Sequence, residues 1–139
     1  MICNPIGTAH SGTTVFTSNT KIKILELTEF VNLKTVGRYF VNGCNNLEEV
    51  YLPSSLTTIG DYAFVGTQKV KKFYCYAQTA PALGNRVFAN TQPTSMGYNT
   101  RTQNNAFHVP VNATGYDAGE YSTALISRAN CGFTIYYDL

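Results

Sequence analysis

Apolar and polar residues alternate in a short phrase that returns along the chain. In LEEVYLP the apolar residues Val50 and Leu52 flank Tyr51, and the same frame recurs in VKKFYCY about one repeat later, in IKILELT about one repeat earlier, and in AFHVPV closer to the C-terminus. Alternation of this kind predicts a short strand that is buried on one face. The sequence therefore predicts four equivalent strands.

The residues that follow each strand also repeat. TVGRYFVNGCN, which begins at Thr35, aligns with TIGDYAFVGTQ, which begins at Thr58, and ALGNRVFANT from Ala82 is a weaker copy. The spacing between the first two copies equals the spacing between Leu47 and Val70 in the strand phrases. The repeating unit thus contains the strand and everything up to the next strand.

The stretch LPSSLTTIGDYAFVGT indicates how one unit closes. Pro53 ends the strand, Ile59 points back into the core, and Gly60 is expected to permit a turn. Phe64 supplies bulk on the opposite wall, and Gly66 lets the chain reverse towards the next strand. A single coil cannot bury its own core but stacked coils can, so the pattern predicts a solenoid of three to four coils with parallel strands in register.

These phrases resemble the BspA-like leucine-rich repeat family, whose repeat reads L-x-x-V-x-L-P-x-x-[VL]-x-x-I-G-x-x-A-F-x-x-[CT]. The match is closest over LEEVYLPSSLTTIGDYAFVGT, fair over residues 22–45 and partial over residues 70–91. The resemblance implies a β-rich leucine-rich-repeat solenoid. It also implies a non-catalytic module of a cell-surface or secreted protein of gut or oral anaerobic bacteria, which mediates adhesion or recognition of a protein or glycan.

The remaining segments are expected to complete one domain. Residues 1–19 form an N-terminal cap or degenerate coil with a strand at TTVFT, residues 20–91 hold the repeats, and residues 92–105 form an irregular loop. Residues 106–139 supply the last coil strand and a cap. This cap comprises a helix from Gly119 to Ala129 and a terminal strand in GFTIYYDL, and the helix is expected to cover the open end of the solenoid.

The net charge and the distribution of apolar residues limit the classes of partner that the sequence indicates. The formal net charge of +2, without a long run of Lys or Arg, does not indicate nucleic acid. No segment approaches the roughly 20 apolar residues that would cross a bilayer. The N-terminal residues do not resemble a signal peptide, which suits either the interior of a longer exported protein or a protein that does not use that route.

Cysteines and histidines offer little chemistry in this sequence. Four well-separated cysteines lack metal-ligand spacing, so no metal or cofactor is expected, and buried thiols are favoured over disulfides. A small hydrolase that uses Cys75 and His108 is an alternative, but Cys75 occupies an inward core position. A further alternative is a structural or host-recognition component of a phage particle, which genomic neighbours would identify.

The candidate binding site is the outer face of the stacked strands. Outward residues of successive strands should form columns, and the two columns predicted here are Glu26, Tyr51, Tyr74 and His108, flanked by Ile24, Glu49, Lys72 and Ala106. Tyrosines among hydrogen-bonding groups suit the surface of a host or bacterial protein or a glycan. Tyr is also frequent on strands that bind nothing, so an ordinary sheet surface is the alternative interpretation of the same columns.

Overall fold

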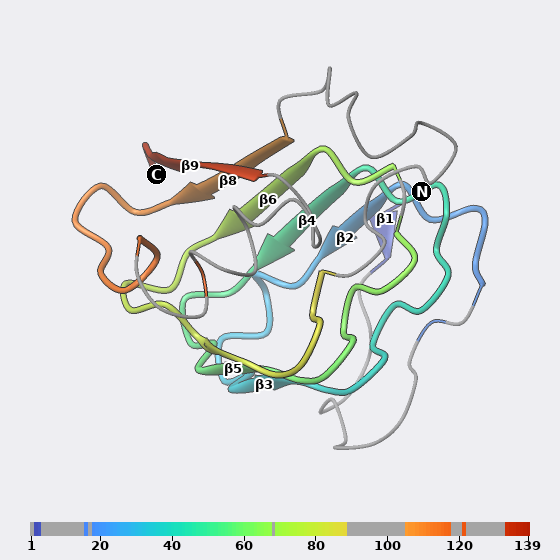
Figure 1. Cartoon of the computed structure of the whole chain (residues 1–139), viewed down its shortest axis with the longest axis horizontal. Helices are drawn as coiled ribbons and strands as arrows, with labels where there is room; N and C mark the ends of the chain where they lie inside the picture. The colour runs from blue at the N-terminus through green and yellow to red at the C-terminus, as the bar shows by residue number, and fades with distance from the viewer. Residues whose placement is uncertain are drawn as a thin grey trace.

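The computed structural model describes residues 2–3, 16, 18–67, 69–88, 105–117, 121 and 133–139. Six parallel strands form one sheet in the order β1-β2-β4-β6-β8-β9. Their bounds are β1 Ile2–Cys3, β2 Ile24–Glu26, β4 Glu49–Leu52, β6 Lys72–Cys75, β8 Asn105–Val109 and β9 Phe133–Tyr137. The strands lie side by side as the chain winds through about three turns of a solenoid (Figure 1).

The register of this sheet confirms the predicted repeat frame. Leu25 pairs with Val50, Val50 with Phe73, and Phe73 with Phe107. All four side chains are buried. The residues two positions further along the chain are buried as well: Leu27, Leu52, Cys75 and Val109. Alternate residues therefore point into one continuous core, as the period of a strand requires.

A second sheet forms the opposite wall of the solenoid, which the sequence predicted only as inward-packing turns. It contains β3 Thr35–Val36, β5 Thr58–Ile59 and β7 Ala82–Leu83, all parallel and in that order. Figure 1 shows β3 and β5 facing the six-stranded sheet across the core. Three successive coils, which carry β2 and β3, β4 and β5, and β6 and β7, thus contribute one strand to each wall. Backbone hydrogen bonds such as Gly60 N–H to Val36 O, 2.8 Å, join neighbouring coils.

Five phenylalanines fill the space between the walls. Phe73 lies at their centre, with ring centroids 5.0 Å from Phe64, 5.2 Å from Phe88, 5.6 Å from Phe107 and 5.2 Å from Phe133. Most of these contacts are edge-to-face, a geometry in which the positive edge of one ring is attracted to the negative face of the next. Because the five rings come from strands and far-wall segments of different coils, this cluster locks the coils together.

The two glycines of the repeat serve different purposes, although a turn follows each of them. The turn after Gly60 is closed by the Ala63 N–H, which donates to Gly60 O at 3.2 Å. Gly66 has φ +74° and Gly43 has φ +71°, so both occupy the left-handed region at the chain reversal, as expected. Gly60 does not have a positive φ. A Cβ there would lie 2.9 Å from the backbone nitrogen of Arg38, so glycine is required because adjacent coils approach closely.

The ends of the chain depart from expectation in part. Within residues 1–19 the sequence predicted a strand at TTVFT, most of which lies outside the described residues, whereas β1 pairs with β2 at Ile2 and Cys3. The expected loop, residues 92–105, is outside the described part except for Asn105, which begins β8.

The C-terminal cap is confirmed only as a strand. β9 pairs with β8 in parallel from Phe133 to Tyr137, as the alternation in GFTIYYDL indicated. The helix expected from Gly119 to Ala129 is not confirmed, because Tyr121, a single residue in helical conformation, is all of that segment that the structure describes.

Candidate functional site

The outward residues of the six-stranded sheet form the predicted central column. Glu26 pairs with Tyr51, Tyr51 with Tyr74, and Tyr74 with His108. The column continues to Tyr136 on β9, a residue that the sequence did not indicate, because β9 carries no copy of the repeat phrase. We call Tyr51, Tyr74, His108 and Tyr136 the ring column.

The rings of this column are stacked on one another. Their centroids are 4.5 Å apart between Tyr51 and Tyr74, 4.7 Å between Tyr74 and His108, and 5.3 Å between His108 and Tyr136. The interplanar angles are 6°, 11° and 22° in the same order. The spacing follows from the separation of neighbouring strands, about 4.8 Å, which brings side chains at the same register into parallel contact. The ring column therefore presents its ring edges and polar tips outward, with its inner ring faces covered.

Polar neighbours hold the first ring in place. The Tyr51 hydroxyl donates to Glu49 Oε2 at 2.7 Å, and Glu49 in turn lies 3.9 Å from the ammonium of Lys72. Burial of the hydroxyl and its hydrogen bond to the Glu49 carboxylate raise the pKa of Tyr51 above its ordinary value. Three of the six predicted site residues, Glu49, Tyr51 and Lys72, thus form one connected group at the side of the ring column.

His108, the third ring of the column, is also held by a polar neighbour. Its Nδ1 lies 2.9 Å from both carboxylate oxygens of Asp138, which follows β9. A carboxylate accepts, so Nδ1 carries the proton and Nε2 remains the second polar atom of the ring. Asp138 was not among the predicted residues, and only the pairing of β9 with β8 brings it to this position.

Glu26 belongs to the column by register but differs from the other members in its contacts. Its Oε1 accepts hydrogen bonds from the backbone N–H of Thr28, at 3.1 Å, and from the Thr28 hydroxyl. These bonds stabilise the turn that follows β2. Glu26 is therefore engaged in a local turn, and the ring column begins one coil later.

The Cys75 and His108 pair of the hydrolase alternative is not assembled. Cys75 is a buried free thiol that points into the core, whereas His108 is on the outer face of the neighbouring strand. The Cys75 sulfur lies 3.2 Å from the hydroxyl of Tyr116, which also donates to the Ala77 carbonyl at 2.8 Å. Burial raises the pKa of the Cys75 thiol above its ordinary 9.0, which disfavours the thiolate that nucleophilic attack needs.

This buried pair predicts that the protein loses stability in alkali. Burial also raises the pKa of Tyr116 above its ordinary 10.0. The unfolded chain then releases both protons at a lower pH than the folded protein, so this stabilisation is complete below about pH 9 and is lost as the pH rises. Urea denaturation from pH 8 to pH 11 should show a falling free energy of unfolding.

The variant Tyr116→Phe isolates the contribution of one group. Above pH 10 it should reduce the slope of stability against pH by up to about 1.4 kcal/mol per pH unit, because one titrating group is removed. Removing the hydroxyl also breaks two hydrogen bonds and lowers stability at every pH. The slope is therefore the diagnostic quantity, and an unchanged slope would contradict the assignment.

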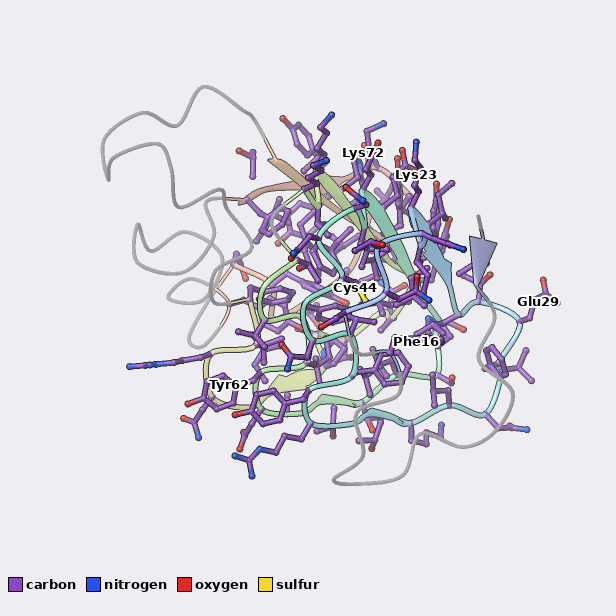
Figure 2. The ribbon with its side chains drawn as sticks, turned by 90° about the vertical axis from the view of Figure 1, so that its right-hand side faces the viewer. Phe16, Lys23, Glu29, Cys44, Tyr62 and Lys72 are labelled. Carbon is purple, nitrogen blue, oxygen red and sulfur yellow. The ribbon has the colours of Figure 1, made fainter. Side chains whose placement is uncertain are left out.

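A second pair of stacked tyrosines lies on a different wall of the solenoid. Tyr39 and Tyr62 occupy equivalent positions in successive coils, with ring centroids 5.1 Å apart and planes at 8°, and the guanidinium of Arg38 lies 5.0 Å from the Tyr39 ring. Both residues have positive φ, 51° and 54°, which is uncommon for large side chains. Figure 2 shows Tyr62 on the side away from Lys23 and Lys72. The pair was not among the predicted site residues, although the aligned phrases TVGRYFVNGCN and TIGDYAFVGTQ place both tyrosines at the same repeat position.

Metal-ligand clusters and membrane-spanning helices were sought among the described residues. No group of three or more His, Cys, Asp or Glu side chains is placed there to hold a metal ion. The same residues contain no helix with the length and apolar character needed to cross a membrane.

Equivalent strands in register, two walls and repeated surface columns define a repeat protein of the parallel β-solenoid class. The family described as "BspA type Leucine rich repeat region (6 copies)" matches residues 5–109. The chain therefore belongs to the BspA-type leucine-rich repeat family, which confirms the resemblance drawn from the repeat phrases. Searches of curated proteins and of solved structures gave no match. Family membership indicates a repeat-based binding module, and such repeats are typically non-catalytic and typical of surface proteins.

Proposed function

We propose that this chain is a non-catalytic recognition module of a bacterial cell-surface or secreted protein, and that the ring column and its polar neighbours form the binding surface. The predicted residues of that surface are Glu26, Glu49, Tyr51, Lys72, Tyr74 and His108, to which we add Tyr136. Its partner is a protein or glycan on a host or bacterial surface, and the module acts in adhesion.

The observation that carries this proposal is the continuous stack from Tyr51 to Tyr136. Each ring is restrained by its neighbours, and hydrogen bonds from Tyr51 to Glu49 and from His108 to Asp138 hold two of the four rings in place. A surface whose side chains are already ordered loses little conformational entropy on binding, so more of the contact energy appears as affinity. Tyrosine is also enriched among the residues that dominate binding energy.

The polar groups of the column favour recognition by hydrogen bonds along its length. Stacking covers the inner ring faces, whereas the phenol oxygens of tyrosine can both donate and accept. Lys72 and Glu49 add one cation and one anion beside them. This arrangement suits a partner that runs along the solenoid and offers alternating donors and acceptors, as a polypeptide backbone or a sugar chain does.

The double substitution Tyr51→Ser and Tyr74→Ser tests the proposal. A ligand is first identified on an array of glycans and host proteins, and its Kd is then measured by biolayer interferometry. We expect the Kd to rise at least about tenfold, because two contacts of the kind that dominate interfaces are removed. The far-ultraviolet circular dichroism spectrum should be unchanged, because both rings lie on the outer face.

The matched control is Tyr39→Ser with Tyr62→Ser, which removes the other stacked pair. It makes the same chemical change on a different wall and should leave the Kd unchanged. If the control variant lost binding and the ring-column variant kept it, the binding surface would lie at Tyr39 and Tyr62 instead.

A further inference from the structure

Half of the basic residues of the chain gather at one edge of the six-stranded sheet. The sequence contains ten Lys and Arg in total. Five exposed lysines lie where the chain enters the strands, and together they are called the lysine edge: Lys21, Lys23, Lys69, Lys71 and Lys72. The edge adjoins the ring column, because Lys72 and Tyr74 belong to the same strand, β6.

The coil register brings these lysines together from two separate parts of the sequence. Backbone N–H groups of Glu48 and Lys71 donate to Lys23 O and Glu48 O at 2.7 and 2.9 Å, which places Lys23, Glu48 and Lys71 in one column. In a parallel column the Lys69 ammonium donates to Asn46 Oδ1 at 2.7 Å. Figure 2 shows Lys23 and Lys72 extending on the same side of the molecule.

The carboxylates within this region are less exposed than the lysines. Glu48 and Glu49 are half-buried, and Glu49 is occupied by the Tyr51 hydroxyl and by Lys72. The side chain of Lys72 is 48% exposed, against 29% for Glu49. Five lysine ammonium groups are thus exposed to solvent, whereas the two carboxylates of Glu48 and Glu49 are partly buried. The lysine edge is therefore a positively charged surface, although the net charge of the chain is small.

We propose that the lysine edge binds a linear acidic polysaccharide in which a charged sugar alternates with an uncharged one. This rests on the proposed function and names the class of ligand for the ring column together with the edge of the sheet beside it. The carboxylates or sulfates of the polymer pair with the lysine columns, and its uncharged sugars and their hydroxyls lie against the adjoining Tyr51 and Tyr74.

The spacing of the lysines selects this class of anion. Lys23 and Lys71 are two coils apart, about 10 Å at the usual separation of strands, and Glu48 lies between them. A nucleic acid duplex carries one phosphate per strand for about every 3.4 Å of helix axis, a density that would also place phosphates at Glu48. A polymer with an uncharged sugar between its charges places no anion at that carboxylate.

The test compares hyaluronan and unsulfated chondroitin, in both of which a glucuronate alternates with an uncharged N-acetylhexosamine, with dextran, which is neutral, and with a DNA duplex. Isothermal titration calorimetry on the whole chain is run at low and at physiological salt. We expect both acidic polysaccharides to bind in a salt-dependent manner and dextran not to bind. The double variant Lys23→Gln and Lys71→Gln should weaken binding about tenfold and reduce its salt dependence, because two cations are lost.

The matched control is Lys34→Gln with Arg86→Gln, which removes the same charge from exposed positions outside the lysine edge. The inference is overturned if both variants weaken binding equally, if DNA binds as tightly as the polysaccharides, or if neither polysaccharide binds at low salt. A ligand found on the array that depends on Tyr51 and Tyr74 but not on the lysines would support the proposed function while contradicting the lysine edge. Polysaccharide binding that depends on the lysines but not on these tyrosines would contradict the ring column alone.

Discussion

Replacing Phe73 with alanine should lower the free energy of unfolding by about 3 to 5 kcal/mol, the range of large aromatic truncations in a packed core. Phe73 is fully buried and its ring contacts phenylalanines from both walls of the solenoid. The cavity left behind is lined by strands that hydrogen bonds hold on both sides, so the walls cannot collapse to fill it. Urea denaturation followed by circular dichroism measures the loss.

Val31→Ala provides the control for this truncation. Val31 is 71% exposed in the turn after β2, and its shortening should change stability by less than about 0.5 kcal/mol. A loss below about 1 kcal/mol for Phe73→Ala would mean that the five phenylalanines do not form the centre of the core.

Gly60→Ala should cost about 3 kcal/mol or more, although it adds a single methyl group. That carbon would lie 2.9 Å from Arg38 N and from Gly37 C and 3.1 Å from Val36 O, all backbone atoms of the preceding coil. A flexible side chain could move aside, but these atoms are held by the hydrogen bond from Gly60 N–H to Val36 O. The added atom therefore forces two coils apart, which exceeds ordinary overpacking. Thermal denaturation should show a correspondingly lower Tm.

Gly66→Ala separates this collision from backbone strain. Its φ of +74° disfavours alanine by about 1 to 2 kcal/mol, but the nearest atom to the new Cβ is 3.5 Å away, which is an ordinary contact. We therefore expect Gly60→Ala to be the more harmful variant. The reverse order would show that the coils are less closely packed at Gly60 than this geometry requires.

The spacing of the repeat was sufficient to predict the register of the ring column from Tyr51 to His108. Once Val50, Phe73 and Phe107 are assigned to the core, the residue after each must point outward at the same level. The period of a strand and the length of a coil together fix that position. The partners of each side chain did not follow from the spacing, because the bonds to Glu49 and Asp138 depend on rotamers and on β9.

Tyr136 and Asp138 could not be placed from the sequence for a physical reason. The alternation in GFTIYYDL predicts a strand, but a strand alone does not specify its neighbour or its register. β9 pairs with β8, but no copy of the repeat phrase lies between them. The repeat spacing therefore could not predict the register of β9 relative to β8. The two-residue strands of the second sheet escaped prediction because they are too short to display any period.

The lysine edge was present in the sequence as two separate groups, around Lys23 and around Lys71. Neither group is long enough to indicate a charged surface by itself. The two groups come together only in the folded solenoid, where backbone hydrogen bonds align Lys23, Glu48 and Lys71 in successive coils. In a repeat protein, a charged surface is therefore better predicted from equivalent positions in successive coils than from consecutive residues in the sequence.

The ring column places aromatic side chains at regular intervals along the solenoid. Each coil adds one rung, and the rungs lie 4.5 to 5.3 Å apart along the direction in which the solenoid grows. Duplication of one repeat would lengthen the surface by one fixed step without altering the rungs already present, and loss of a repeat would shorten it by the same step. A change in the number of coils would thus change the length of the proposed binding surface in fixed steps and leave the chemistry of each rung as it is.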